Sequence, residues 1–443
     1  MSTAAIPEFP AGFRWGVSTA AYQIEGGVDA GGRGASIWDT FAHSGGRIAD
    51  GSTGDVACDH YHRHAEDVAL LAGLGVSAYR FSIAWPRVRP TGDGPVEPRG
   101  LDFYDRLVDD LLAHDIDPVA TLYHWDLPQA LEDAGGWLTR DTAHRFAEYA
   151  DATAARLGDR VKLWITLNEP FVHMSLGHGT GEHAPGRTLL FDAFPVAHHQ
   201  LLGHGLAVAA LRAHTASPIA IANNYSPVRP AGDTAADRAA VAAYEALHNR
   251  LFTDPLFGRG YPAELGFDTS VVRAGDLDAI AAPIDVLGVN YYNPTGVRAA
   301  PEGSPLPFEL VPVAGYPRTA FDWPVAPDGL HELLGWLHRT YADDLPPIQI
   351  TESGCAYDDR PDADGRVHDP ERIAYLDGHL RAVRAAMAEG VDVTGYFVWS
   401  LLDNWEWAEG FTKRFGLVHV DFDTQLRTPK SSYAWLRDLI RRP

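Results

Sequence analysis

Eight short runs of apolar, β-branched and aromatic residues recur along the chain, and each has the length and composition of a buried strand. They span residues 13–20, 77–83, 118–123, 162–166, 219–223, 286–290, 348–351 and 394–400. Amphipathic stretches separate several of these runs. Residues 66–71 and 103–112, for example, have apolar side chains at helical spacing and carboxylates on the opposite face. The pattern therefore predicts strands that alternate with helices.

Eight such units predict a single (β/α)8 TIM barrel domain over residues 1–443. A bare barrel needs about 250 residues, so the excess is expected in long βα loops at the C-terminal face, at residues 35–59, 171–187 and 299–324. A doubly wound open sheet is the alternative fold. It would need a glycine-rich phosphate loop directly after an early strand, and Gly31-Gly32-Arg33-Gly34 follows polar residues and does not complete that motif.

Two of the predicted strands stop abruptly on a glutamate. Glu169 ends the fourth run and is followed by Pro170, and Glu352 ends the seventh and is followed by Ser353-Gly354. Because the carboxyl ends of barrel strands meet at one mouth, both carboxyl groups are expected in one cleft. A pair of carboxyl groups in one cleft is the equipment for cleaving a glycosidic bond.

Polar or aromatic side chains end nearly every other predicted strand as well. They are Gln23, Arg80, His124-Trp125-Asp126, Asn168, Asn290-Tyr291-Tyr292 and Trp399, followed by the segment 404–411. Aromatic faces match the C–H surface of a pyranose, and amides and carboxylates match its hydroxyl groups. The mixture therefore favours a sugar pocket.

Composition narrows the possible partners. The net charge is −23 and no basic cluster is present, so nucleic acid and anionic membrane surfaces are poor partners. No run of 18 apolar residues predicts a transmembrane helix, and residues 1–8 carry no export signal, which favours a cytoplasmic protein.

Cys58 and Cys355 are expected to be free thiols, and the sequon Asn224-Tyr225-Ser226 is expected to be accidental.

With these motifs in view, the chain resembles glycoside hydrolase family 1, the β-glucosidase family, from about Phe9 to about Trp435. The matching segments are 13–16, 23–26, 36–41, 79–87, 122–128, 166–170, 290–292, 351–352 and 399–404. The resemblance implies a retaining β-glycosidase with Glu352 as nucleophile and Glu169 as general acid/base. Retaining enzymes hold these two carboxyl groups about 5–5.5 Å apart.

The resemblance also implies roles for the surrounding residues. Arg80 and Tyr292 would stabilise the ionised nucleophile, and Trp323 would form a wall of the leaving-group subsite. The non-reducing sugar would contact Gln23, His124, Trp125, Asn168, Asn290, Trp399, Glu406, Trp407 and Phe415. No cofactor and no metal is expected.

Three positions refine the implied substrate. Glu169 is not the glutamine of the family's plant thioglucosidases, which favours O-glycosides. Glu406 stands where 6-phospho-glycosidases lack that carboxylate, which favours unphosphorylated sugars. Ser353 replaces the asparagine of the family's usual Thr-Glu-Asn-Gly segment, and we expect at most a modest effect on the position of the nucleophile.

The expected reaction is release of terminal β-D-glucosyl residues from O-glycosides and short β-gluco-oligosaccharides, with side activity on β-galactosides and β-fucosides. The preference among these sugars and the oligomeric state stay open. A metal-dependent barrel is an alternative suggested by His60, His62, His64 and His198-His199, although no HExxH or similar ligand pattern is present. A non-catalytic sugar-binding protein on the same fold is a second alternative, but it would normally lack one of the two glutamates.

Overall fold

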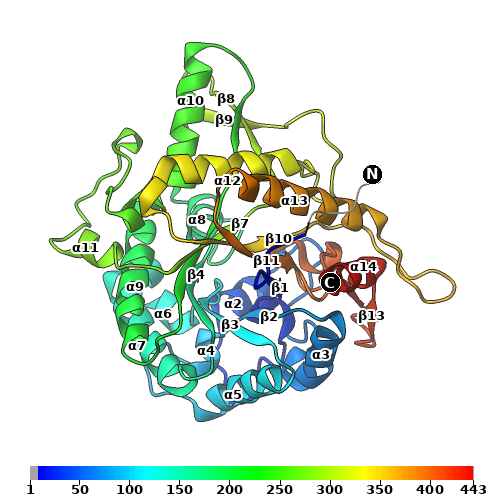
Figure 1. Ribbon diagram of the computed structural model, residues 1–443. Coiled ribbons are helices and arrows are strands. Elements are labelled where there is room, and N and C mark those ends of the chain that lie inside the picture. The colour runs from blue at the N-terminus through cyan, green and yellow to red at the C-terminus, as the bar shows by residue number, and fades with distance from the viewer. Residues whose placement is uncertain (1–7, 443) are drawn as a thin grey trace.

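The computed structural model describes residues 8–442, and its centre is a closed parallel barrel (Figure 1). Going round the barrel, the strands follow the order β1, β11, β10, β7, β5, β4, β3, β2. Their bounds are β1 Arg14–Ser18, β2 Ala78–Ser82, β3 Asp117–Tyr123, β4 Leu163–Asn168, β5 Ile219–Asn224, β7 Val286–Asn290, β10 Ile348–Ser353 and β11 Val393–Trp399. All eight predicted strands and the (β/α)8 barrel are thus confirmed, with ends that differ by a few residues.

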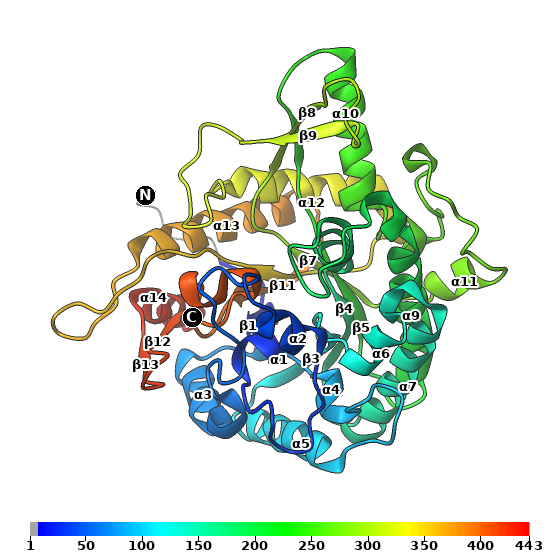
Figure 2. The same cartoon turned by 180° about the vertical axis from the view of Figure 1, so that it is seen from behind.

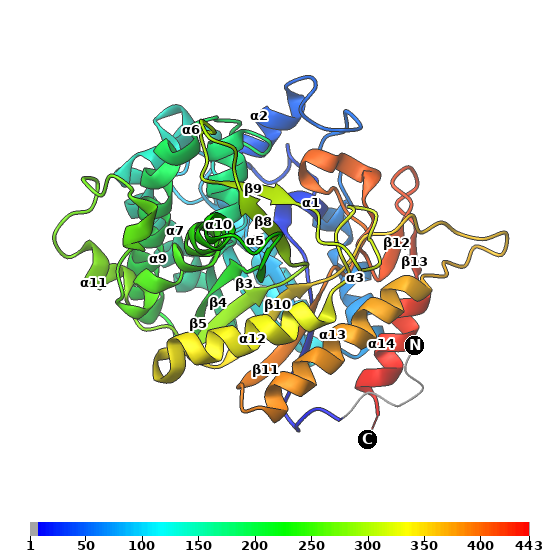
Figure 3. The same cartoon turned by 90° about the horizontal axis from the view of Figure 1, so that it is seen from above.

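Helices cover the outside of the barrel, as the views from behind and from above also show (Figures 2 and 3). The longer ones are α3 His60–Leu74, α5 Pro98–Ala113, α7 Arg140–Leu157, α9 Phe194–Arg212, α12 Pro327–Tyr341, α13 Pro370–Ala388 and α14 Ser431–Ile440. The predicted helical stretches 66–71 and 103–112 lie within α3 and α5. Within residues 8–442, no helix is both long and apolar enough to span a bilayer. Residues 1–7, on which the prediction of no export signal largely rests, lie outside the described residues.

The barrel interior is closed by side chains of the strands. Ala78, Val119, Leu163, Ile165, Ala220, Ala222, Val286 and Phe397 form one buried cluster there. Gly16 on β1 leaves room for this packing, because a Cβ at that position would lie 2.2 Å from the Phe397 ring. The interior is therefore a packed core and not a pore.

The three segments predicted as long loops contain regular structure. Residues 35–59 include α2 Ile37–His43, and residues 171–187 include most of α8 Pro170–Val172 and the π-helical segment His173–Thr180. A small sheet of β6 Val228–Pro230, β8 Thr295–Ala299 and β9 Phe308–Val311 packs with α10 Ala235–Glu245 and projects from the barrel (Figure 1). These strands are short, and β6 pairs with β8 across a long stretch of sequence, whereas β8 and β9 pair locally.

The remaining elements are shorter. They are α1 Ala21–Ile24, α4 Trp85–Val88, α6 Gln129–Asp133, α11 Asp276–Ile280, β12 Val418–Val420 and β13 Arg427–Pro429. Cys58 and Cys355 are both buried and free, as predicted.

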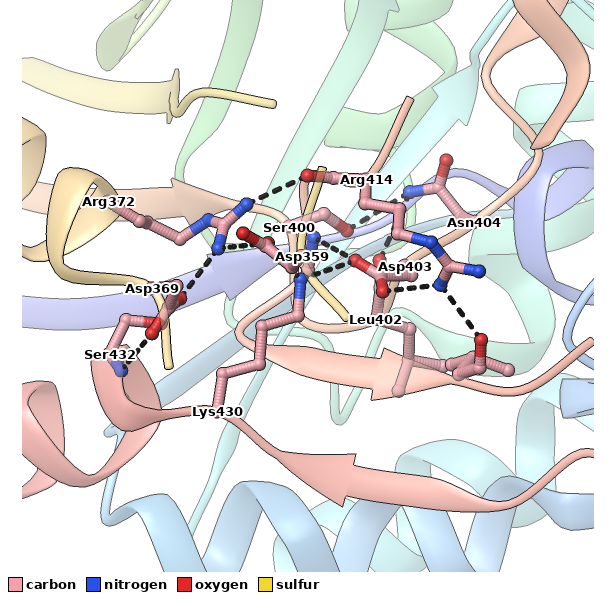
Figure 4. A network of polar contacts seen from close by, with 12 residues as sticks. Asp359, Asp369, Arg372, Ser400, Leu402, Asp403, Asn404, Arg414, Lys430 and Ser432 are labelled. Carbon is pink, nitrogen blue, oxygen red and sulfur yellow. Dashed lines mark hydrogen bonds and ion pairs between the residues drawn. The ribbon is translucent and has the colours of Figure 1, made fainter. Parts of the chain in front are cut away.

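A buried network of charged side chains joins α13 and α14 to the segments that follow β10 and β11 (Figure 4). The Lys430 Nζ lies 2.6 Å from an Asp359 oxygen and 2.8 Å from an Asp403 oxygen. Arg372 pairs with Asp359 and with Asp369 at the start of α13, and Arg414 pairs with Asp403. Positive and negative charges are thus matched, and all of these side chains except the partly exposed Arg414 are buried.

Replacing Lys430 by methionine would leave two buried carboxylates with one partner fewer. We expect Lys430→Met to lower the free energy of unfolding by about 3–5 kcal/mol, because an uncompensated buried charge remains. Equilibrium urea denaturation measures this change. Lys162→Met, at an exposed lysine next to β4, is the matched control and should change the free energy little. Equal stability of the two variants would show that the network contributes nothing to folding.

Candidate active site

A cavity of about 410 Å³ opens at the carboxyl ends of the barrel strands, and we call it the main cavity. Both predicted catalytic glutamates line it. It is also lined by eight of the other predicted site residues: His124, Trp125, Tyr292, Trp323, Trp399, Glu406, Trp407 and Phe415. The expectation that the two carboxyl groups share one cleft is therefore correct.

The other four predicted residues lie directly behind this lining, and each donates a hydrogen bond to a residue of the cavity wall. Arg80 bonds to Glu352, Asn290 to Glu169, Asn168 to His124, and Gln23 to Glu406. All four are buried. They orient the side chains that face the cavity.

Glu352 lies at the end of β10 and is held by two strong donors. Arg80 Nη1 donates to its Oε1 at 2.6 Å, and the Tyr292 hydroxyl donates to its Oε2 at 2.7 Å. Burial raises the pKa of Glu352, whereas the guanidinium and the hydroxyl act to lower it. The charged carboxylate thus has a partner on each oxygen.

Glu169 has a different environment, made of neutral amides. Asn290 Nδ2 and Asn224 Nδ2 both donate to its Oε1, at 2.8 and 3.1 Å. Burial, with the nearby charge of Glu352, raises the pKa of Glu169 to about 8. At neutral pH this carboxyl group is therefore mainly protonated.

Asn168 links Arg80 and Asn290 to His124 through hydrogen bonds. Its Oδ1 accepts from Arg80 Nη2 at 2.6 Å and from Asn290 Nδ2 at 3.0 Å, so its Nδ2 must point the other way. That Nδ2 donates to His124 Nε2 at 2.9 Å. Burial lowers the pKa of His124 well below its usual value, so the ring is neutral and carries its proton on Nδ1.

Several buried polar atoms at or near the main cavity have no hydrogen-bond partner within residues 8–442. Among them are the Nδ1 donor of His124, the Oε1 acceptor of Gln23 and the Nδ1 of His183. The Gln23 Nε2 is already used, with Glu406 Oε2 at 3.0 Å and with Asn404. A ligand hydroxyl group can accept from a free donor and donate to a free acceptor.

Glu406 lies beyond β11 on the same side of the cavity. Burial raises its pKa to about 8, although the bond from Gln23 acts in the opposite direction. The carboxyl group is thus largely neutral near pH 7, and its repulsion of a sugar phosphate is weaker than the sequence argument assumed. However, among the described residues no lysine or arginine lines the main cavity to attract a phosphate.

Aromatic rings surround these polar groups. Trp407 packs on Trp125 at 4.6 Å between ring centroids, and His124 lies 5.8 Å from Trp399. On another part of the wall, Phe321 stacks on Trp323 at 4.4 Å. The cavity therefore combines flat apolar faces with directed polar atoms.

The backbone is strained at three of these positions. Trp125, Glu169 and Trp407 have φ values of 78°, 44° and 47°, in the left-handed region that favours glycine. Such conformations cost of order 1–3 kcal/mol each and persist where the surrounding packing fixes them. Here they turn side chains from the strand ends towards the cavity.

Ser353, which stands where the family usually has asparagine, contacts α13 and does not line the main cavity. Its Oγ lies 3.2 Å from the Tyr375 hydroxyl of α13. The neighbouring Thr351 Oγ1 donates to Asn290 Oδ1 at 2.6 Å, which turns the Asn290 amide group towards Glu169.

Sequence reasoning missed several residues of the site. The sequence marks Asn224 only as part of a sequon, yet Asn224 ends β5 and donates to Glu169, and His248 Nε2 contacts its Oδ1 at 2.8 Å. The rule that polar strand ends face the mouth would have found Asn224. Other residues of the wall are Val172, Leu176, Glu182, His183 and Phe321, which lie in segments without a comparable signal, and Glu409, which lies in the segment 404–411 that the sequence indicates.

The histidines that suggested a metal-dependent barrel have protein partners. His60, His62 and His64 lie in the first turns of α3 and not in a loop before it, and each pairs with a different aspartate. His198 bonds to Asp276, and His199 bonds to the Trp137 carbonyl. Within residues 8–442, no group of three or more His, Cys, Asp or Glu side chains is arranged to hold a metal ion.

Comparisons with known proteins agree with this geometry. A family model described as glycosyl hydrolase family 1 matches residues 6–443. Thermostable β-glucosidase B of Thermobispora bispora is 52% identical over 98% of this chain and 91% of its own length. A bifunctional β-D-glucosidase/β-D-fucosidase of Bifidobacterium breve is 47% identical over 98% of both chains. The crystal structure of the family 1 β-glucosidase from Thermotoga maritima in complex with isofagomine lactam is 45% identical, covers 98% of both chains and superposes with a TM-score of 0.93. The chain therefore belongs to glycosyl hydrolase family 1.

Proposed function

We propose that this family 1 glycosyl hydrolase is a retaining β-glucosidase whose residues 1–443 form one catalytic domain. It releases terminal non-reducing β-D-glucosyl residues from O-glycosides and short β-gluco-oligosaccharides, with side activity on β-galactosides and β-fucosides. The observation that carries the proposal is the asymmetry of the two glutamates in one cavity. Glu352 is bound by a guanidinium and a hydroxyl, and Glu169 only by amides.

In the first step Glu352 attacks the anomeric carbon and Glu169 gives its proton to the leaving oxygen. The Arg80 and Tyr292 contacts keep Glu352 charged, and the raised pKa keeps a proton on Glu169. The product of this step is a covalent glycosyl-enzyme.

In the second step Glu169 acts as a base. Once Glu352 is an ester, its negative charge no longer acts on Glu169, so the pKa of Glu169 falls. The ionised Glu169 then takes a proton from water, which attacks the anomeric carbon from the side that the leaving group vacated. Two displacements at the same carbon retain its configuration.

The sugar is held on the side of the cavity opposite the leaving group. We assign its ring face to Trp399, its hydroxyl groups to Gln23, His124, Glu406 and Trp407, and its 2-hydroxyl to Asn168, which also contacts Arg80. The free donor on His124 and the free acceptor on Gln23 fit one hydroxyl group. Trp323, stacked on Phe321, forms a wall for the leaving group.

Removing the nucleophile tests its assignment. We expect Glu352→Gly to abolish hydrolysis of p-nitrophenyl β-D-glucoside, and added azide to restore product as α-D-glucosyl azide, because azide enters from the face that Glu352 occupied. Nuclear magnetic resonance identifies the anomer. Glu409→Gly, at another glutamate of the cavity wall, is the control and should yield no glucosyl azide. Recovery of the β-azide from Glu352→Gly would refute the assignment.

Removing the acid should affect substrates according to their leaving groups. For Glu169→Ala we expect formation of the glycosyl-enzyme to slow by about 10²- to 10⁴-fold with alkyl glucosides. It should change little with 2,4-dinitrophenyl glucoside, whose phenolate leaves without a proton. Pre-steady-state kinetics measures this step, and an equal loss on both substrates would contradict the acid role.

The pH dependence gives a second readout of the same residue. Since the protonated form of Glu169 is the active acid, kcat/KM for alkyl glucosides should fall as pH rises through the pKa of about 8, with half of the maximum lost near that pH. This alkaline limb should be absent in Glu169→Ala. Its persistence in the variant would assign the limb to another group.

The assignment of Glu406 can be tested with a sugar that lacks one hydroxyl. We expect Glu406→Ser to lower kcat/KM for p-nitrophenyl β-glucoside by about 10- to 100-fold, through loss of hydrogen bonds to a carboxyl group. The loss should be smaller for p-nitrophenyl 6-deoxy-β-D-glucoside, which lacks only the 6-hydroxyl. An unchanged specificity constant for both would remove Glu406 from the sugar site.

A further inference from the structure

A second cavity of about 400 Å³ lies beside the main one and differs from it in chemistry. Its wall is almost entirely apolar and is formed by Phe171, Met174, Leu190, Phe191, Phe194, Leu247, Phe267, Leu306, Phe308 and Leu310, among others. Glu182 is the one charged residue among the described residues that line it. The volume is within the range of small-ligand pockets. The mechanism above makes no use of it.

The two cavities have a common wall. Val172, Leu176 and Glu182 line both of them. In addition, Phe171 of the second cavity stacks on His248 of the main cavity at 4.2 Å between ring centroids. The space for an apolar ligand thus adjoins the active site directly.

The common wall begins at the proton donor. Glu169 directly precedes α8, and the π-helical segment His173–Thr180 continues from it. A leaving group protonated by Glu169 therefore starts near this wall. Val172 and Leu176, farther along the wall, are only partly buried and line both cavities.

The rim of the second cavity is unusually apolar. Leu190 is 46% exposed and Leu310 is 55% exposed, and they are two of the five large hydrophobic residues that are exposed in the described chain. Water contact with these side chains is unfavourable, and a hydrocarbon group laid against them would remove it. Because the cavity is concave, it fits such a group better than it fits a flat protein surface.

From these observations we propose that the second cavity binds the apolar part of the leaving group, an alkyl or terpenoid hydrocarbon joined to the glucose through oxygen. The proposal rests on the proposed β-glucosidase function and names its preferred substrate class. The sugar and the first atoms of the aglycone occupy the main cavity. The hydrocarbon then passes Val172 and Leu176 into the second cavity.

A series of alkyl β-D-glucosides from methyl to decyl, used below their micelle concentrations, tests the proposal. We expect kcat/KM to rise by about three- to fourfold for each methylene that leaves water, and to level off when the cavity is full. The readout is the ratio of kcat/KM for octyl glucoside to that for methyl glucoside. A ratio near one in the unmodified protein would overturn the proposal.

Variants at the rim show whether the second cavity causes the effect. The double variant Leu190→Glu/Leu310→Glu places charge where the hydrocarbon would lie and should reduce the octyl/methyl ratio by at least tenfold. Leu426→Glu is the matched control, because Leu426 is 62% exposed and lines neither cavity. An equal ratio in the double variant and the control would refute the assignment of the hydrocarbon to this cavity.

Two further measurements separate the possible failures. Calorimetric binding of octyl and methyl glucoside to Glu352→Gln gives the same ratio without catalysis, so the aglycone site can be judged even if the proposed hydrolysis is wrong. Sedimentation velocity tests the competing occupant, a second copy of this chain. If the double variant dissociates an oligomer while its octyl/methyl ratio is unchanged, the apolar surface is a subunit interface and the proposal fails.

Discussion

The buried guanidinium of Arg80 is the interaction on which the site depends. It reaches Glu352, Asn168, Thr121 and the Thr351 carbonyl, and none of its surface is exposed. A charged group so far from water is tolerable only with a full set of partners. The carboxylate of Glu352 is therefore a partner that the buried guanidinium needs, whatever its role in chemistry. Through Asn168, the same guanidinium also sets the tautomer of His124, so one cation fixes a partner for Glu352 and leaves the Nδ1 proton of His124 free.

Most of the barrel could be predicted because its strands carry a local signal. Runs such as 286–290 and 348–351 are apolar, short and separated by amphipathic stretches, and the observed strands begin at the same residues. The small sheet beside α10 could not be predicted in this way. Its strands have three to five residues, and β6 pairs with β8 between positions about 67 residues apart, so this contact lies outside any short window, although β8 and β9 pair locally. The glycines of segment 173–180 likewise indicate a loop, although packing holds it as a π-helix.

The residues of the candidate site also divide into those that a local sequence signal locates and those that it does not. Side chains at strand ends, such as Glu169, Glu352 and Arg80, could be located from the sequence because the barrel brings all carboxyl ends together. Asn224 follows the same rule and was overlooked because its motif suggested another role. The apolar second cavity is different in kind. Its wall comes from α8, the π-helical segment, α9, α10 and β9, and only the folded chain brings them side by side.

The charge network around Lys430 has a consequence for how the site matures during synthesis. Asp403 directly precedes Asn404, whose Oδ1 accepts from Gln23, and Lys430 comes later in the chain than every strand of the barrel. All eight barrel strands precede this lysine in the chain and are synthesised before it. Until it is added, Asp403 lacks one of its counterions. The segment that leads from Asp403 to Glu406 is thus anchored by a residue at the start of α14 that does not line the main cavity.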